Sequence, residues 1–393
     1  MINPSLLSWV ARYNNLSDEK DHHSNLNNLR DLSIVIPTFS RQDYILRQIY
    51  YWASTKATIF IMDGSSEPLD DSLLLLLSKI GNIKYFHLEI SYVERIKKAC
   101  DHIKTRYAMC LADDDIYLKE GICKAIDFMN KNKDPLGCIS KPMGLDYNFA
   151  RKETMLFPYG DSLENFRVID DNISERLEYA MASYRTATSY ALFRSNEFKL
   201  IWNGIISSSC LEATEYEHAI STYIYGKLEN CGSLYWLRSH ECEPVDSIID
   251  GTRRTTFDLW CKDSVYEKEY ISMVERLNNK IIFNSKLNKN EASNLILNSI
   301  GHLNGKHEGL MNDSLTLRFM QYVLKILEYV PFIKKFVIYL RFTKYGKKIR
   351  SMIRIVTRKG DSLQSKNHQS ILLSNNEALK KVVEFVNQFH QLK

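Results

Sequence analysis

Long apolar runs, closely spaced cysteine pairs and abundant glycine or proline are all missing from this sequence of 393 residues. No stretch reaches about 18 uninterrupted apolar residues, so we predict no transmembrane helix. The eight cysteines form no CxxC pair and show no zinc-like spacing with histidine, which favours reduced thiols in a cytoplasmic protein. With only 15 glycines and 8 prolines, long disorder is not expected. The first residues also lack the basic start and long apolar run of a secretory signal.

The sequence has instead a large apolar fraction and an uneven distribution of charge. Hydrophobic residues make up 45% of the chain, which is enough for one large core or two smaller ones. The net charge is +5, but residues 318–359 contain twelve lysines and arginines against a single acid, Glu328. The chain is therefore a mildly acidic body with a strongly basic segment near its C-terminus.

Strand-like and helix-like segments alternate in the first third of the chain. Apolar runs typical of buried strands lie at residues 32–39, 57–67, 83–89 and 107–112. Amphipathic stretches between them fit helices, and the clearest one, 91–105, begins with Ser91 and Glu94 as a capping box. This alternation predicts an α/β domain with a mostly parallel sheet flanked by helices, in which ligands bind beyond the carboxyl ends of the strands.

The rest of the chain is less regular. We predict strands at 185–195 and 232–240, a helix at 209–227 and a polar helical region at 260–310. The whole chain divides into a polar leader, an α/β domain and a helical C-terminal region, at 1–30, 31–250 and 251–393.

Three consecutive aspartates, Asp113, Asp114 and Asp115, follow the fourth predicted strand. A turn needs one aspartate at most and adjacent like charges repel, so the cluster indicates either solvation or a bound cation. Asp63 ends the second predicted strand, so Asp63 and the three aspartates all lie at the carboxyl ends of predicted strands. Mg²⁺ or Mn²⁺ bound to a nucleotide diphosphate needs only one or two carboxylates. This edge of the sheet is therefore a candidate nucleotide site.

The segments "LSIVIPTFSR", "IFIMDGSS" and "YAMCLADDDIYLKEG" resemble, in order and spacing, the nucleotide-binding half of family 2 glycosyltransferases with the GT-A fold. The resemblance covers roughly residues 31–245, and residues 91–115 look closest to a bacterial branch linked to capsule and lipopolysaccharide glycans. It implies a Rossmann-like GT-A fold with a helical C-terminal extension. It also implies the metal-dependent, inverting transfer of a sugar from a nucleotide-sugar donor.

The resemblance assigns roles to the motif residues by position. Asp63 matches the acid that contacts the uracil base or the ribose, and Thr38 lies in the loop that lines the base. Asp113 and Asp114 fall in the donor site. Asp115 matches the ligand of the Mn²⁺ or Mg²⁺ ion.

Two further assignments come with an alternative. Arg95 matches a recurrent basic position and is expected to approach the diphosphate, unless it lies on a solvated helix face. His240 lies in the region where, in several GT-A enzymes, a histidine completes the metal shell, unless it is an ordinary histidine. The sequence also departs from the family, which often has two acids before the Gly/Ser turn, whereas Gly64 follows Asp63 here.

The inverting reaction implied by the resemblance needs a carboxylate as general base. Glu215 stands eleven residues before Gly226, which fits the interval in the family, although aspartate is more usual there. Glu212 is the second candidate, and Glu217 points elsewhere at helical spacing. The alternative is an exposed helix that carries three solvated glutamates.

The basic amphipathic segment, 315–359, interleaves apolar and basic residues. This pattern favours a helix lying on an anionic membrane surface. Packing against the catalytic domain and a nucleic-acid patch are the alternatives, and we expect no nucleic acid partner.

The leading hypothesis is a cytoplasmic glycosyltransferase, peripheral on the inner face of the cytoplasmic membrane. It would use a UDP-sugar as donor and a bacterial surface glycan or lipid-linked glycan as acceptor. A nucleotidyltransferase is the second hypothesis, although "PTFSRQDY" lacks the glycine-rich phosphate loop that such enzymes normally show. A non-catalytic nucleotide- or glycan-binding module is the third.

Overall fold

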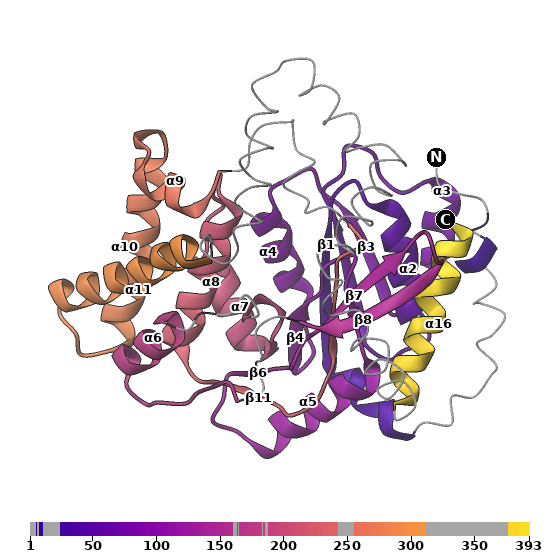
Figure 1. The fold of residues 1–393 in the computed structure, drawn as a ribbon, viewed down its shortest axis with the longest axis horizontal. Coiled ribbons are helices and arrows are strands. Elements are labelled where there is room, and N and C mark those ends of the chain that lie inside the picture. The colour runs from indigo at the N-terminus through magenta and orange to yellow at the C-terminus, as the bar shows by residue number, and fades with distance from the viewer. Residues whose placement is uncertain are drawn as a thin grey trace.

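The computed structural model describes residues 5, 8–10, 24–159, 163, 165–182, 184, 188–242, 255–310 and 376–393. Within them the chain is a GT-A-like α/β fold, with a mostly parallel central sheet flanked by helices and a helical C-terminal region, as predicted (Figure 1). No helix in these residues is long and apolar enough to cross a membrane. The predicted basic segment, 315–359, lies outside the described residues.

The main sheet carries the strands that the sequence placed first. Its order is β3 (Ile83–His87), β2 (Thr58–Asp63), β1 (Leu32–Thr38), β4 (Tyr107–Cys110), β10 (Leu192–Arg194), β6 (Gly137–Ile139), β11 (Leu228–Asn230) and β9 (Arg167–Val168). Strand β1 pairs in parallel with β2 and β4, while β10 runs antiparallel to β4 and β6. The carboxyl ends of β1, β2 and β4 therefore meet at one edge.

A second, smaller sheet was not predicted. Its order is β5 (Ile116–Tyr117), β12 (Trp236–Ser239), β7 (Met143–Asn148) and β8 (Glu153–Pro158). Strand β12 pairs with β5 through Leu237 and Ile116. Because β5 directly follows the three aspartates, this pairing brings β12 beside the acidic cluster.

Helices cover both sheets. They are α2 (Gln42–Trp52), α3 (Asp71–Ser78), α4 (Tyr92–His102), α5 (Lys119–Lys131), α6 (Ile173–Ala182), α7 (Ser195–Asn203), α8 (Leu211–Tyr225), α9 (Phe257–Lys262), α10 (Glu267–Asn284), α11 (Lys289–Leu310) and α16 (Glu377–Leu392). Short 3-10 helices are η1 (Ser24–Asp31), η2 (Thr188–Tyr190) and η4 (Ser264–Tyr266). In Figure 1, α9, α10 and α11 lie beyond α8, whereas α16 lies at the opposite end beside α2, β7 and β8.

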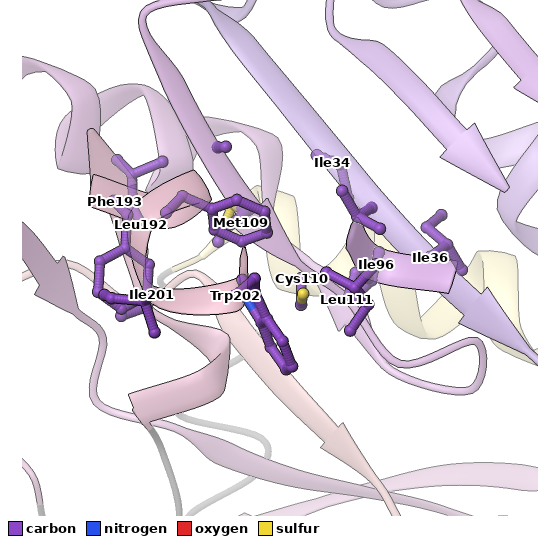
Figure 2. Close-up of a cluster of buried hydrophobic side chains, with 14 of the residues drawn as sticks. Ile34, Ile36, Ile96, Met109, Cys110, Leu111, Leu192, Phe193, Ile201 and Trp202 are labelled. Atoms are coloured by element: carbon purple, nitrogen blue, oxygen red, sulfur yellow. The ribbon is translucent and has the colours of Figure 1, made fainter. Parts of the chain in front are cut away.

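The core beneath the main sheet joins three strands to two helices (Figure 2). Ile34 of β1, Met109 of β4 and Phe193 of β10 meet Ile96 of α4 and Trp202 of α7, and all five are at most 1% exposed. The runs of apolar residues in β1 and β4 are therefore explained by burial on both faces, as expected for central strands of a parallel sheet.

Two strand predictions differ from the structure. In the described part of 185–195, only Leu192–Arg194 is a strand, because Thr188–Tyr190 forms the 3-10 helix η2. The strand expected at 232–240 begins only at Trp236, since Gly232 adopts a left-handed φ of 71° in a turn. The helix predicted at 209–227 is confirmed as α8.

Candidate active site

The structure brings the predicted acidic residues to one edge of the main sheet. Thr38 at the end of β1 is in register with Asp63 at the end of β2. The Thr38 hydroxyl donates a 2.8 Å hydrogen bond to Oδ2 of Asp113, which follows β4. Residues 112–115, here named the acidic turn, are closed by a hydrogen bond from Asp115 N to Ala112 O. The polar residues that end or follow β1, β2 and β4 therefore lie together at one edge of the main sheet.

Asp63 is 1% exposed and fully engaged with its surroundings. Its Oδ1 accepts hydrogen bonds from the backbone N (2.9 Å) and hydroxyl (2.5 Å) of Ser65, and its Oδ2 accepts one from the Tyr85 hydroxyl at 2.8 Å. Ser65 in turn accepts a hydrogen bond from Ser40 N. The carboxylate therefore fixes the two loops that follow β1 and β2.

Arg95 lies beneath these loops, so the alternative of a solvated helix face is wrong. It is 5% exposed, and its guanidinium donates to the carbonyls of Met62 (2.8 Å) and Thr38. Burial lowers the pKa of Arg95, and the charge of Asp63 opposes that shift. A Cβ at Gly64 would come within 2.6 Å of the Arg95 guanidinium carbon. The glycine that departs from the family pattern thus leaves room for this arginine.

Arg41 pairs with the acidic turn and was missed in the sequence. Its Nη1 lies 2.9 Å from Oδ1 of Asp113 and 3.3 Å from Oδ2 of Asp114. Burial, followed by the charges of Asp113 and Asp115, raises the pKa of Asp114 well above its usual range, although Arg41 opposes the shift. The sequence offered one indication of this role, because Arg41 is the basic residue in "PTFSRQDY", the loop that follows the first predicted strand.

Asp115 is held from the second sheet. Its Oδ2 accepts a hydrogen bond from Trp236 Nε1 at 2.8 Å, and its Oδ1 accepts one from Ser239 N at 2.7 Å. Burial raises the pKa of Asp115 to about 6, and these two hydrogen bonds limit the rise. Trp236 is itself stacked on Tyr190 at 4.6 Å between ring centroids.

The backbone of the acidic turn is held from behind by helix α2. Gln48 Nε2 donates to the carbonyls of Asp113 (2.9 Å) and Asp115 (2.7 Å). Arg47 Nη2 donates to the carbonyl of Asp114 at 2.5 Å. Both side chains are buried in the middle of an amphipathic helix, where the sequence pattern alone does not distinguish them from other polar positions.

The three glutamates of α8 have separate environments, so the alternative of three solvated glutamates is wrong. Glu212 Oε2 accepts a hydrogen bond from Phe257 N at 2.9 Å, at the start of α9. Glu217 is 2% exposed and pairs with Arg276 at 2.9 and 2.7 Å. The half-buried Glu215 accepts a 2.9 Å hydrogen bond from the Tyr184 hydroxyl.

Arg238 of β12 links the acidic turn to Glu215 electrostatically. Burial would lower the pKa of Arg238, yet its surroundings raise it overall. Tyr159 and Tyr190 contribute first, followed by the carboxylates of Asp115 and Glu215. A guanidinium thus lies within electrostatic reach of both carboxylates.

His240 follows β12, and its backbone N donates to Leu145 O at 2.7 Å. Its ring centroid lies 5.3 Å from that of Phe157 and 5.9 Å from that of Tyr159. Among the residues that the structure describes, no three His, Cys, Asp or Glu side chains form a group able to hold a metal ion by themselves.

One family model matches the part of the chain that holds the strand ends and the acidic turn. Residues 33–189, which contain the strand ends and the acidic turn, match the family model "Glycosyl transferase family 2". No curated protein sequence matches this chain.

Among solved structures, TarS from S. aureus is similar. TarS 1–349 in complex with UDP-GlcNAc has a TM-score of 0.49 and 11% identity, covering 84% of this chain and 92% of that chain. A second structure of TarS 1–349 has a TM-score of 0.47 and 12% identity, covering 84% and 91%. A longer TarS structure has a TM-score of 0.43 and 12% identity, covering 69% and 43%.

The family match contains the strand ends and the acidic turn, whereas Glu215 and strand β12 lie beyond the matched residues. The match of residues 33–189 to the glycosyltransferase family 2 model supports a glycosyltransferase activity for this protein.

Proposed function

We propose that this glycosyltransferase moves a sugar, with inversion at its anomeric carbon, from a UDP-sugar to a hydroxyl group of a bacterial surface glycan. The observation that carries the proposal is the meeting of Thr38, Asp63 and Asp113 at the carboxyl ends of three neighbouring strands. In open α/β sheets this is where nucleotides bind.

The nucleoside part of the donor is assigned to the loops after β1 and β2. Asp63 is already oriented by Ser65 and Tyr85, so that its position needs no rearrangement when a base or ribose arrives. Thr38 lies beside it and connects this region to the acidic turn. Arg95 contributes from below by fixing the loop carbonyls, which keeps it in the donor site as a supporting residue.

The acidic turn fits a divalent cation that is shared with a diphosphate. Mg²⁺ and Mn²⁺ in such sites need only one or two protein carboxylates, because phosphate oxygens and waters complete the shell. Asp115 is the proposed ligand, since a carboxylate has about four acceptor positions and Trp236 and Ser239 use two of them. His240 is the second candidate ligand. When bound, the ion would stabilise the negative charge of the departing diphosphate.

Glu215 is the proposed general base. The acceptor oxygen forms a bond to the anomeric carbon while the bond from that carbon to the diphosphate oxygen breaks. The hydroxyl proton passes to the Glu215 carboxylate, which Tyr184 orients through its hydroxyl group. Glu212 and Glu217 are committed to Phe257 and Arg276.

Arg238 supplies a fixed positive charge in the same region. The charges of Asp115 and Glu215 both help to raise the pKa of Arg238, so its guanidinium is electrostatically coupled to the proposed metal ligand and to the proposed base. A fixed cation stabilises negative charge most effectively where water is excluded. We assign Arg238 to stabilisation of the departing diphosphate.

The acceptor and the membrane association rest on the sequence. Residues 91–115 are similar to a branch of the family that builds capsule and lipopolysaccharide glycans, and residues 315–359 are strongly basic. A lipid-linked acceptor at the cytoplasmic face of a membrane would suit both features.

A screen of nucleotide sugars by thermal shift, with and without Mn²⁺, tests the proposal. A ligand that binds only the folded protein raises the free energy of unfolding by an amount that grows with the logarithm of ligand concentration over Kd, so the tighter ligand gives the larger shift. We expect a UDP-sugar to give the largest shift, and to require the cation. Equal shifts from all nucleotides, or none from any, would contradict the proposal.

A further inference from the structure

Helix α16 reaches the back of the candidate site from a distant part of the sequence. It lies against the second sheet and α2 (Figure 1). Its apolar face packs on strands β5, β7, β8 and β12 and on Leu118, which follows β5. Together they form a second core, made of Ile116, Leu118, Leu145, Leu156, Leu237, Leu379, Val382 and Val386. The second sheet, which holds Asp115 through Trp236 and Ser239, therefore has α16 as its packing partner.

The last turn of α16 joins a buried ionic network. Glu241 Oε2 accepts hydrogen bonds from Arg47 Nη1 at 2.7 Å and from the Ser239 hydroxyl at 2.9 Å. Its Oε1 is hydrogen-bonded to Nε2 of His390. The side chains of Arg47, Glu241 and His390 are at most 1% exposed. His390 is also stacked on Tyr147, with ring centroids 4.0 Å apart.

Both ends of this network contact the acidic turn. Arg47 uses its other terminal nitrogen to bind the carbonyl of Asp114, and Ser239 uses its backbone N to bind the carboxylate of Asp115. Three hydrogen bonds therefore lead from His390 to the acidic turn. The first joins His390 to Glu241, the second joins Glu241 to Arg47 or Ser239, and the third joins Arg47 to Asp114 or Ser239 to Asp115. A buried carboxylate that loses one partner is left under-compensated, and the groups paired with it shift in response.

We propose that His390 is a positioning residue, through which helix α16 fixes the acidic turn in the geometry that receives the donor diphosphate. The helix is thereby a working part of the catalytic domain rather than an appended tail. This inference rests on the proposed function for the identity of the ligand, but the structural coupling can be measured without any ligand.

Three variants of the full chain separate positioning from general stability. His390→Phe retains an aromatic ring against Tyr147 and removes the hydrogen-bonding nitrogen. His390→Gln retains a donor in a similar place. Asn387→Ala is the matched control on the same helix, because Asn387 accepts its hydrogen bonds from the Thr154 backbone N (2.7 Å) and hydroxyl (2.8 Å) on β8 rather than from Arg47, Ser239 or Glu241.

Hydrogen–deuterium exchange of the unliganded protein gives the first readout. We expect His390→Phe to increase exchange in peptides covering residues 111–118 and 236–242, and His390→Gln to restore protection. Asn387→Ala should increase exchange at 150–158 instead. Should His390→Phe fail to fold, the smaller His390→Leu replaces it with the same expectations. Unchanged exchange at 111–118 and 236–242, or the same pattern as in Asn387→Ala, overturns the proposal.

Titration with UDP and Mn²⁺ gives the second readout. Loss of a direct partner of a metal ligand typically weakens binding by 10–100-fold. Because His390 acts on Asp115 through Glu241 and Ser239, we expect the lower end of this range, about tenfold weaker UDP binding in His390→Phe. His390→Gln and Asn387→Ala should stay within about twofold of wild type. If wild type binds no UDP, the proposed function fails, and the exchange data alone decide the coupling. If wild type and His390→Phe bind UDP equally, the positioning role is overturned while the proposed function stands.

Discussion

Thr38 and Asp113 are joined by a 2.8 Å hydrogen bond across 75 positions of sequence. The bond connects the end of β1 to the acidic turn after β4, and both side chains are at most 3% exposed. A loop assigned to the nucleoside and a turn assigned to the diphosphate are thus one rigid unit. Substitutions in either should affect the binding of the whole donor.

Asp115→Ala should abolish Mn²⁺-dependent UDP binding, because the diphosphate would lack the cation that neutralises it. Isothermal titration with UDP and Mn²⁺ measures this directly. Asp101→Ala, which removes an exposed carboxylate at the end of α4, is the control and should bind normally.

Asp115→Ala also removes the carboxylate that accepts hydrogen bonds from Trp236 Nε1 and Ser239 N. Each buried donor left without a partner costs about 1–3 kcal/mol, so the unfolding free energy of Asp115→Ala has to be measured alongside. A folded variant with wild-type affinity for UDP and Mn²⁺ would remove Asp115 from the metal site.

Glu215→Gln should leave UDP binding intact and lower kcat by about 10²–10⁴-fold, as expected for loss of a general base. Glu212→Gln is the matched control, because its amide oxygen still accepts the hydrogen bond from Phe257 N. The rate of single-turnover transfer to an acceptor mimic distinguishes the Glu215→Gln variant from the Glu212→Gln variant. If Glu212→Gln is the inactive variant, the role of base passes to Glu212, and if both are active, the base lies elsewhere.

The buried His218 of α8 should make the protein sensitive to acid. It is fully buried, and neither ring nitrogen has a hydrogen-bond partner in the described part of the chain. Burial, helped by the charge of Lys280, lowers the pKa of His218 to about 3. The unfolded chain therefore binds a proton that the folded state rejects, so stability falls as the pH drops from about 6.5 towards 3.

At pH 4 this linkage amounts to about 3 kcal/mol of lost stability relative to neutral pH. Urea unfolding at a series of pH values measures it. His218→Leu should flatten the dependence by about that amount, whereas His302→Leu, at an exposed position of α11, should leave it as it is. If the free energy of unfolding of His218→Leu depends on pH as in wild type, other groups govern acid unfolding.

The basic segment should bind anionic vesicles. Each basic residue near an anionic surface contributes about 1 kcal/mol, so replacing Lys344, Lys347, Lys348 and Arg350 by Gln should reduce binding strongly. These substitutions are preferable to truncation, which would also remove α16 from the second core. Flotation with vesicles at low salt and at 1 M salt, where the Debye length is about 3 Å, tests the idea. A full-length protein that stays out of the vesicle fraction at low salt contradicts it.

The main sheet and the meeting of acids at its edge were predictable from the sequence. The apolar runs that became β1, β2 and β4 are short, β-branched or fully buried, and each is followed by a polar turn. Parallel strands joined by helices must present their carboxyl ends together, so Asp63 and Asp113 had to approach each other.

The supporting contacts were not predictable. Gln48, Arg47 and Trp236 act through distant hydrogen bonds to the acidic turn, and a side chain facing a remote carbonyl leaves no periodic pattern. Of the second sheet, only β12 falls in a predicted strand. Strand β5 has just two residues, β7 and β8 were not predicted, and the helix that packs on the sheet lies far away in sequence.

The dependence of the second sheet on α16 also bears on how the protein is made. About 140 residues separate Leu237 of β12 from Leu379, the first core residue of α16. At the 5–20 residues per second of synthesis, the ribosome needs roughly 7–30 seconds to cover that distance. During this interval Leu145, Leu156 and Leu237 have no helix to cover them. The nascent chain therefore carries an exposed apolar face, which is the kind of surface that chaperones bind and that leads to aggregation when expression outpaces folding.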